Sequence, residues 1–214
     1  MTSAALGILA IWNDCRPGRE ADFEQWFQGE HLEERLSVPG FLFGRRHEAI
    51  SGSSAFFNFY VTETPAVLTS KPYLDRLNDP TPMTRRIMSE VFTNMCRTVC
   101  RRSARLTNVR GAFAVTARFN EAADEGALAA SLQSLADDPA IAGGEIWIAA
   151  DQPDVSIAAE EKLRGGDRKI KACLMVDTLR QSDAEKLGVR LAADFPKAEV
   201  GVFRVLCQLG RGDL

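Results

Sequence analysis

The sequence has very little histidine and tyrosine and no long apolar run. Two of its 214 residues are histidine and two are tyrosine. No stretch approaches the ~20 apolar residues that a helix needs to span a bilayer. The first residues, MTSAALGILAIWND, carry no Lys or Arg before their apolar run, whereas a secretory signal starts with a basic segment. We therefore expect a cytoplasmic protein with no membrane partner.

The charge balance gives no basic surplus. Lys and Arg total 26 against 29 Asp and Glu, for a formal net charge of -3. Nucleic-acid binding usually leaves a basic excess or stripe, so we expect no nucleic-acid partner. Hydrophobic residues make up 45% and charged residues 26%, which is typical of a soluble globular chain.

Cysteine is scattered and odd in number. The five positions are Cys15, Cys96, Cys100, Cys173 and Cys207. Cys96 and Cys100 would lie ~13 Å apart on an extended strand, too far for a disulfide, which needs Cα atoms within ~7 Å. The sequence contains no CxxC pair, HExxH or GxGxxG motif. We therefore expect free thiols, no metal and no cofactor.

Turn signals and hydrophobic periodicity divide the chain into two halves with one element order. The first half reads β-α-β-β-α-β, with strands at 4–12, 41–50, 55–62 and 93–105 and helical regions at 19–36 and 64–91, the second interrupted near 78–80. The second half repeats the order, with strands at 112–119, 141–150, 169–178 and 200–209 and helices at 125–135 and 182–195. Residues 152–167 read as irregular or partly helical, and Ser182 with Glu185 has capping-box spacing.

The repeated order predicts an α+β protein made of two ferredoxin-like units. We place them at residues 1–106, which hold the candidate site, and 107–214, a structural partner, joined by a short exposed connection near Thr107 and Asn108. Strand segments such as GILAIW, AFFNFYV and KACLMV do not alternate cleanly, as expected for strands buried on both faces. The two sheets would therefore close against each other as an eight-stranded barrel-like core with helices outside.

The first helix carries an aromatic stripe. Phe23, Trp26, Phe27 and Glu30 follow at i, i+3, i+4 and i+7. At ~100° per residue, His31 lies about 80° from Phe23, at the edge of that stripe.

The segment FEQWFQGEHLEERLSVPGFLFGRR, residues 23–46, resembles the dimeric α/β-barrel superfamily, in particular its EthD-like members. The resemblance rests on Trp26-Phe27, Glu30-His31, Pro39-Gly40-Phe41 and Arg45-Arg46. It implies a histidine beside a cleft between helix and sheet, in a family that includes cofactor-free enzymes. The first helix of the second half, GALAASLQSLADDP, has neither histidine nor an aromatic pair.

His31 is the candidate catalytic residue. It lies between Glu30 and Glu34, and a neighbouring carboxylate fixes the imidazole tautomer and raises its basicity. The candidate ligand-binding residues are Trp26 and Phe27, which would line the cleft, with Arg46 or Tyr60 steadying a ligand oxygen. The alternative is a histidine at a helix edge with a purely structural role.

The second histidine and the strand arginines have competing interpretations. His47 reads as a half-buried strand residue; with His31 and a glutamate it could also form a two-histidine, one-carboxylate iron site, which the spacing does not predict. Five arginines lie on predicted strands: Arg45, Arg46, Arg97, Arg101 and Arg102. They could bind a carboxylate or enolate oxygen, but we favour ion pairs with Glu30, Glu33 and Glu34 of the first helix.

Two functions remain open from the sequence. The first is a cofactor-independent enzyme that acts on an apolar, carbonyl-bearing metabolite with His31 as acid or base. The second is a non-catalytic binding or structural barrel. Either could form a homo-oligomer. An open pocket that reaches His31 would favour the enzyme, and a pocket filled by Trp26 or Phe43 would favour the barrel without activity.

Overall fold

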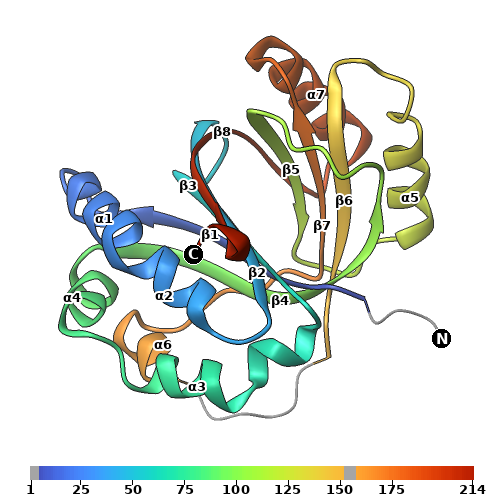
Figure 1. The fold of residues 1–214 in the computed structure, drawn as a ribbon. Coiled ribbons are helices and arrows are strands. Elements are labelled where there is room, and N and C mark those ends of the chain that lie inside the picture. Colours follow the sequence, from blue (N-terminus) through green and yellow to red (C-terminus); the bar gives the residue numbers. More distant parts are fainter. Residues whose placement is uncertain (1–4, 152–157) are drawn as a thin grey trace.

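The computed structural model describes residues 5–151 and 158–214. Its strands are β1 (Gly7–Cys15), β2 (Phe41–Ser51), β3 (Phe56–Thr62), β4 (Phe92–Arg105), β5 (Phe113–Phe119), β6 (Ile141–Ala149), β7 (Ala172–Thr178) and β8 (Glu199–Gly210). They form one closed barrel in the order β1-β3-β2-β8-β5-β7-β6-β4, with helices on its outside (Figure 1).

The helices fall into two groups. Those of the first half are α1 (Glu20–Trp26), a π turn (Phe27–His31), α2 (Leu32–Ser37), a 3₁₀ turn (Pro65–Thr69), α3 (Lys71–Asn78) and α4 (Pro82–Glu90). Those of the second half are α5 (Glu125–Gln133), α6 (Ala159–Leu163), α7 (Gln181–Asp194) and a terminal 3₁₀ turn (Arg211–Asp213). No helix in the described part of the chain is both long and apolar enough to cross a bilayer.

The two halves have the same strand order. The first reads β4-β1-β3-β2 and the second β8-β5-β7-β6, each the order of a ferredoxin-like unit. Antiparallel pairs β2–β8 and β4–β6 join the units and close the barrel. The predicted α+β fold, two β-α-β-β-α-β units forming an intramolecular barrel, is confirmed.

Burial on both faces explains the strand sequences. Every residue of β3 and β7 is buried, as the loss of alternation predicts. The barrel interior is filled by aromatic and small apolar side chains, among them Trp12, Phe57, Phe59, Trp147 and Phe203. Two further cores lie between the outer sheet faces and the helices of each half.

One helix crosses from the second half to the first. Helix α6 follows β6 in the chain, but it packs against α3 and α4 rather than beside α5 and α7 (Figure 1). The β6–β7 connection of the second half therefore covers part of the first-half helical layer.

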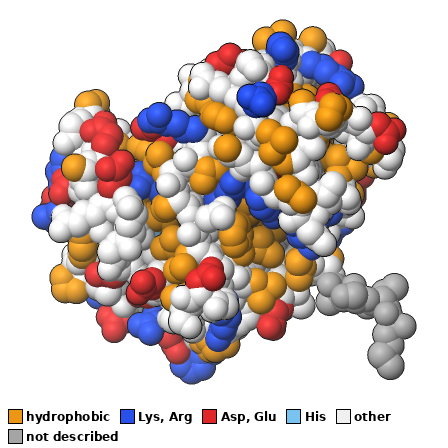
Figure 2. Space-filling model, turned by 45° about the horizontal axis from the view of Figure 1, so that its top comes forward, with side chains coloured by type: hydrophobic (Ala, Val, Ile, Leu, Met, Phe, Trp, Pro, Cys, Tyr) orange, Lys and Arg blue, Asp and Glu red, His pale blue; other side chains and the backbone are white. Residues whose placement is uncertain are grey.

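Side chains of both charges share the face seen in Figure 2. Figure 2 shows acidic and basic side chains mixed over the visible face, with hydrophobic side chains in the hollow between the two parts of the molecule. This mixture matches the small net charge of -3.

Some predicted details need correction. Helix α7 begins at Gln181 with Arg180 at the N-cap, so Ser182 is not the cap. The side-chain amide of Gln181 donates to Glu185 Oε1 at 2.8 Å. Glu185, the expected acid of the capping box, therefore bonds Gln181. Residue 4 and residues 152–157, which fall within predicted segments, lie outside the described residues.

Candidate functional site

A π turn places His31 in the site. The turn Phe27–His31 joins α1 to α2 and adds one residue to the helical repeat. Trp26 and His31, five residues apart, consequently stack with ring centroids 3.9 Å apart. His31 is buried at 6% exposure, and Glu30 is only partly buried. For a regular helix, we expected Glu30 on the buried face and His31 at its edge. The π turn reverses these positions, because His31 is the buried residue.

A narrow slot lies between this helix and the outer face of the first-half sheet. Its walls are mainly apolar and aromatic, with Leu9, Ile11, Phe23, Trp26, Phe27, Leu77, Met88, Phe92 and Met95 among them. The space open to the centre of a water molecule is about 40 Å³. That space holds a few waters, whereas an apolar cavity of about 150 Å³ accepts benzene. An aromatic ligand would therefore have to widen the slot.

His31 and Glu34 lie side by side next to the slot, and Glu34 is also 3.9 Å from Arg35. His31 Nδ1 lies 3.9 Å from Glu34 Oε2, too far for a hydrogen bond. Both atoms are buried without a hydrogen-bond partner within the described residues. Burial, followed by the charges of Arg35 and Arg164, holds the pKa of His31 well below its ordinary value. The imidazole is thus neutral at pH 7, and the expectation that Glu30 and Glu34 raise its basicity is wrong, because burial and two arginines outweigh them.

The two tyrosines of the slot differ in their hydrogen bonds. The Tyr60 hydroxyl is buried and has no partner in the part of the chain that the structure covers, and burial raises its pKa. The Tyr73 hydroxyl accepts a hydrogen bond from Arg97 at 2.6 Å. The Tyr60 and His31 rings lie 6.2 Å apart at a steep angle. Tyr60 therefore contributes the unused hydroxyl of the slot.

Helix α4 fixes the aromatic wall. Trp26 Nε1 donates to Thr84 Oγ1 at 2.9 Å. Thr84 and Thr81 in turn donate to Glu30 Oε1 at 3.1 and 2.5 Å. These hydrogen bonds tie both Trp26 and Glu30 to helix α4. Glu34 is then the carboxylate that lies next to His31.

Two slot residues come from the second half of the sequence. Glu160 of α6 accepts a buried hydrogen bond from Arg35, and both side chains are at most 5% exposed. Arg164 also lines the slot and is held by Asp167 through two bonds of 2.7 Å. Sequence reasoning missed Arg35, Glu160 and Arg164, because nothing in an irregular segment indicates a partner more than 100 residues away.

Arg46 lies outside the slot. Its guanidinium stacks 3.9 Å from the Phe23 ring centroid and also faces Phe27 and Phe56. None of its three nitrogens has a hydrogen-bond partner among residues 5–151 and 158–214, and burial lowers its pKa. The structure thus brings His31, Trp26, Phe27 and Tyr60 together around the slot. Arg46 does not line the slot and packs against Phe23, one of its wall residues.

The expected ion pairs between strand arginines and the first helix are wrong. Within the described chain, the arginines other than Arg46 contact different groups: Arg45 bonds Asp177, Arg97 bonds Tyr73, Arg101 bonds Glu125 and Arg102 bonds Glu145. Because side chains alternate along a strand, Arg45 faces the barrel interior and cannot reach the helices outside.

His47 is fully buried inside the barrel, not half-buried as expected. Its ring stacks on Phe57 and Phe59, and Nδ1 lies 3.0 Å from the Phe57 carbonyl oxygen, to which a protonated Nδ1 donates. Burial, followed by the charge of Arg45, lowers its pKa to about 3. His31 lies on the other face of the sheet, so the two histidines cannot share an iron ion. Across the described residues, no three His, Cys, Asp or Glu side chains are grouped as metal ligands.

The five cysteines, all within the described residues, are free thiols. Cys96, Cys100 and Cys173 belong to the barrel core. Burial raises the pKa of Cys100 to about 12 and that of Cys15 to about 11. Protonated thiols of this kind behave as small apolar side chains.

Comparison with known proteins identifies the fold. No protein-family profile and no curated protein sequence matches the chain. An anthrone oxidase-like protein matches 100% of this chain and 96% of its own, at 12% identity and a TM-score of 0.68. A candidate monooxygenase from Fusobacterium nucleatum matches 100% of this chain and 98% of its own, at 8% identity and a TM-score of 0.61. A candidate chlorite dismutase matches 98% of this chain and 97% of its own, at 8% identity and a TM-score of 0.56.

Another match is described as a haem-binding protein from Thermus thermophilus, at 9% identity and a TM-score of 0.50. The residues of this chain do not fit a histidine-ligated haem. Both histidines lie in the first half; His47 is enclosed in the barrel core, and His31 opens on a slot of about 40 Å³. A porphyrin needs a far larger cavity and an accessible axial ligand.

These matches run over nearly the whole chain, but their identities of 8–12% speak for the fold alone. Each aligns with both halves, as the repeated strand order requires. The chain therefore has the dimeric α+β-barrel fold, with both ferredoxin-like units in a single polypeptide.

Proposed function

We propose that the slot beside His31 binds a small, largely apolar molecule bearing a carbonyl group, and that His31 acts on it as an acid or base. One observation carries this proposal: His31 and Tyr60 line an apolar slot, and the Tyr60 hydroxyl is buried there without a partner among the described residues. Leaving such a group unpaired costs about 1–3 kcal/mol. A ligand whose carbonyl oxygen accepts from the Tyr60 hydroxyl would recover that energy.

The geometry suggests a division of roles. Nδ1 of His31 is on the Glu34 side of the ring, so Nε2 lies on the opposite side and, in the neutral ring with Nδ1 protonated, carries the free lone pair. Nε2 would accept a proton from the carbon next to the ligand carbonyl. Tyr60 would donate a hydrogen bond to the carbonyl oxygen as it becomes an enolate. Glu34 would stabilise the resulting imidazolium.

The walls define the ligand class. Trp26 and Phe27 offer flat apolar surfaces that suit an aromatic or unsaturated body. The name of one fold relative, anthrone oxidase-like, refers to an aromatic ketone, which agrees with this chemistry. Since the free slot is narrow, single-ring ketones are the first ligands to test.

Calorimetric titration with acetophenone, 1-indanone and anthrone tests the binding site. We expect His31→Ala and Tyr60→Phe to weaken binding at least 10-fold. His47→Leu is the matched control, because it removes the histidine inside the barrel and leaves the slot untouched. Equal affinity in the native protein and His31→Ala, or no binding of any ketone, would refute the proposal.

A second measurement separates catalysis from binding. In D₂O, transfer of an acetophenone methyl proton to His31, followed by return of a deuteron, would replace hydrogen by deuterium, which NMR detects. The proposed chemistry predicts exchange that is lost in His31→Ala. Ketone binding without faster exchange than in His31→Ala would support the alternative of a non-catalytic binding barrel.

A further inference from the structure

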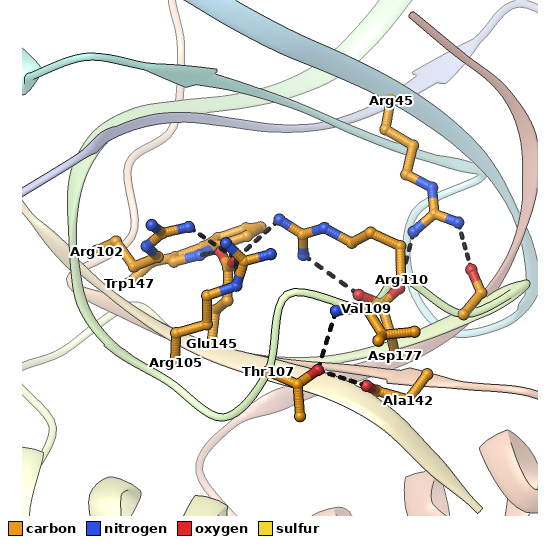
Figure 3. A network of polar contacts seen from close by, with 11 residues as sticks. Arg45, Arg102, Arg105, Thr107, Val109, Arg110, Ala142, Glu145, Trp147 and Asp177 are labelled. Atoms are coloured by element: carbon orange, nitrogen blue, oxygen red, sulfur yellow. Dashed lines mark hydrogen bonds and ion pairs between the residues drawn. The ribbon is translucent and has the colours of Figure 1, made fainter. Parts of the chain in front are cut away.

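A buried network of charges fills one end of the barrel, away from the slot (Figure 3). It comprises four arginines and two acids: Arg45, Arg102, Arg105, Arg110, Glu145 and Asp177. They come from the start of β2, the ends of β4 and β7, the middle of β6 and the linker between the halves. Segments distant in the sequence therefore converge on one point.

A single carboxylate oxygen serves three of these arginines. Glu145 Oε1 lies 3.1 Å from Arg102, 3.3 Å from Arg105 and 2.8 Å from Arg110. Its other oxygen accepts from Trp147 Nε1 at 2.7 Å. A carboxylate oxygen accepts about two hydrogen bonds. Arg105 Nε is the donor left over, buried without a hydrogen-bond partner in the described chain.

The network carries more positive than negative charge. Asp177 is shared between Arg45 and Arg110, at 2.9 and 3.2 Å. The charged groups that act on Arg105 are Glu145, Arg110, Arg102 and Asp177. Arg45 joins them through Asp177, so the network has two acids and four arginines. Burial and neighbouring arginines lower the pKa of Arg105, yet a guanidinium stays protonated in proteins. An excess of buried positive charge is costly unless an anion offsets it.

The linker holds Arg110 in place before any ligand arrives. Thr107 Oγ1 donates to the Ala142 carbonyl at 2.7 Å and accepts from Val109 N at 3.0 Å. A Cβ on Gly111 would lie 2.1 Å from the Thr178 carbonyl oxygen, so only glycine allows this close approach. The linker therefore has little conformational freedom, and Arg110 is preorganised over the barrel end (Figure 3).

Three of the four arginine side chains are partly exposed. The side chains of Arg102 and Arg110 are 16% exposed and that of Arg105 is 24% exposed. We propose that this end of the barrel binds a small oxyanion, the carboxylate or phosphate group of a small molecule, through Arg102, Arg105 and Arg110. Planar guanidinium groups match both oxyanions in geometry. The site is separate from the slot and does not depend on its function.

The three indole N–H signals in a ¹H–¹⁵N spectrum test this site. Trp147 bonds Glu145, Trp26 lines the slot and Trp12 lies near Arg118 at the opposite end of the barrel. Titration with phosphate or citrate, at an ionic strength held constant with sodium chloride, should shift the Trp147 signal saturably. A stronger response to phosphate or to citrate identifies the preferred group.

Two variants on β4 complete the test. Arg105→Gln should weaken the phosphate or citrate response at least 10-fold. Arg101→Gln is the matched control, because Arg101 lies on the same strand, 40% exposed and paired with Glu125 outside the barrel. If Arg105→Gln fails to fold, Arg105→Lys replaces it and should also weaken binding, since lysine has no fork of donors. No saturable shift of Trp147, a shift of Trp26 or Trp12 instead, or equal losses in both variants would overturn the proposal.

Discussion

Replacing Tyr60 by phenylalanine should stabilise the free protein. The Tyr60 hydroxyl is buried without a partner in the described residues, and an unsatisfied buried hydroxyl costs about 1–3 kcal/mol. Tyr60→Phe removes that oxygen and keeps the ring in contact with Phe41 and His31. For a chain of this length, 1 kcal/mol changes Tm by roughly 2–4 °C. We therefore expect Tm to rise by at least about 2 °C.

Tyr73→Phe is the matched control and should act in the opposite direction. Its hydroxyl accepts from Arg97 at 2.6 Å, so its loss leaves a donor of the partly buried Arg97 guanidinium unpaired, at a cost of about 1–3 kcal/mol. Thermal and urea unfolding of both variants give the comparison. A fall in stability for Tyr60→Phe equal to that of Tyr73→Phe would refute the claim that the Tyr60 hydroxyl is unpaired and available to a ligand.

Two further predictions concern charge. Both histidines have folded-state pKa values below 6.5, His47 at about 3; below pH 6.5 the unfolded chain therefore binds more protons, and stability should fall by about 1.4 kcal/mol per pH unit for each histidine. Urea unfolding between pH 7 and 5 should show this loss. The raised pKa values of Glu34 and Asp177 act in the opposite direction, so the comparison is between the native protein and His31→Asn, whose slope should be shallower; an unchanged slope would contradict a neutral His31. Glu160→Gln removes the carboxylate that bonds the buried Arg35 and leaves only the longer 3.9 Å contact with Glu34, so it should cost about 3–5 kcal/mol. Removal of an exposed pair, as in Lys71→Ala, should leave urea unfolding nearly unchanged.

The fold could be predicted from the sequence because its signals are local. Apolar runs, turn residues and helical periodicity mark each element, and the β-α-β-β-α-β order appears in both halves. The strands β3 and β7 are fully buried, and their sequences predict this because polar and apolar residues do not alternate along them. Closure of the barrel follows from these two facts, since strands buried on both faces need a second sheet.

The site could be predicted only in part, because three of its features are not local. A π turn decides that His31 rather than Glu30 is buried, and periodicity analysis assumes a regular helix. Glu160 reaches the slot through a long connection. Within residues 5–151 and 158–214, Arg46 has no ion pair, because aromatic rings pack around its guanidinium. Charge patterns in the sequence cannot show this packing.

The ring-nitrogen spectrum of the two histidines tests the central claim most directly. In ¹⁵N-labelled protein, His31 and His47 are the whole set, and His47 inside the barrel serves as the internal reference. We expect the His31 ring to stay neutral at pH 6 and its Nε2 signal to shift when acetophenone binds, while the His47 signals do not move. A His31 that titrates near pH 6.5, or that stays unchanged when the ketone is bound, would contradict it.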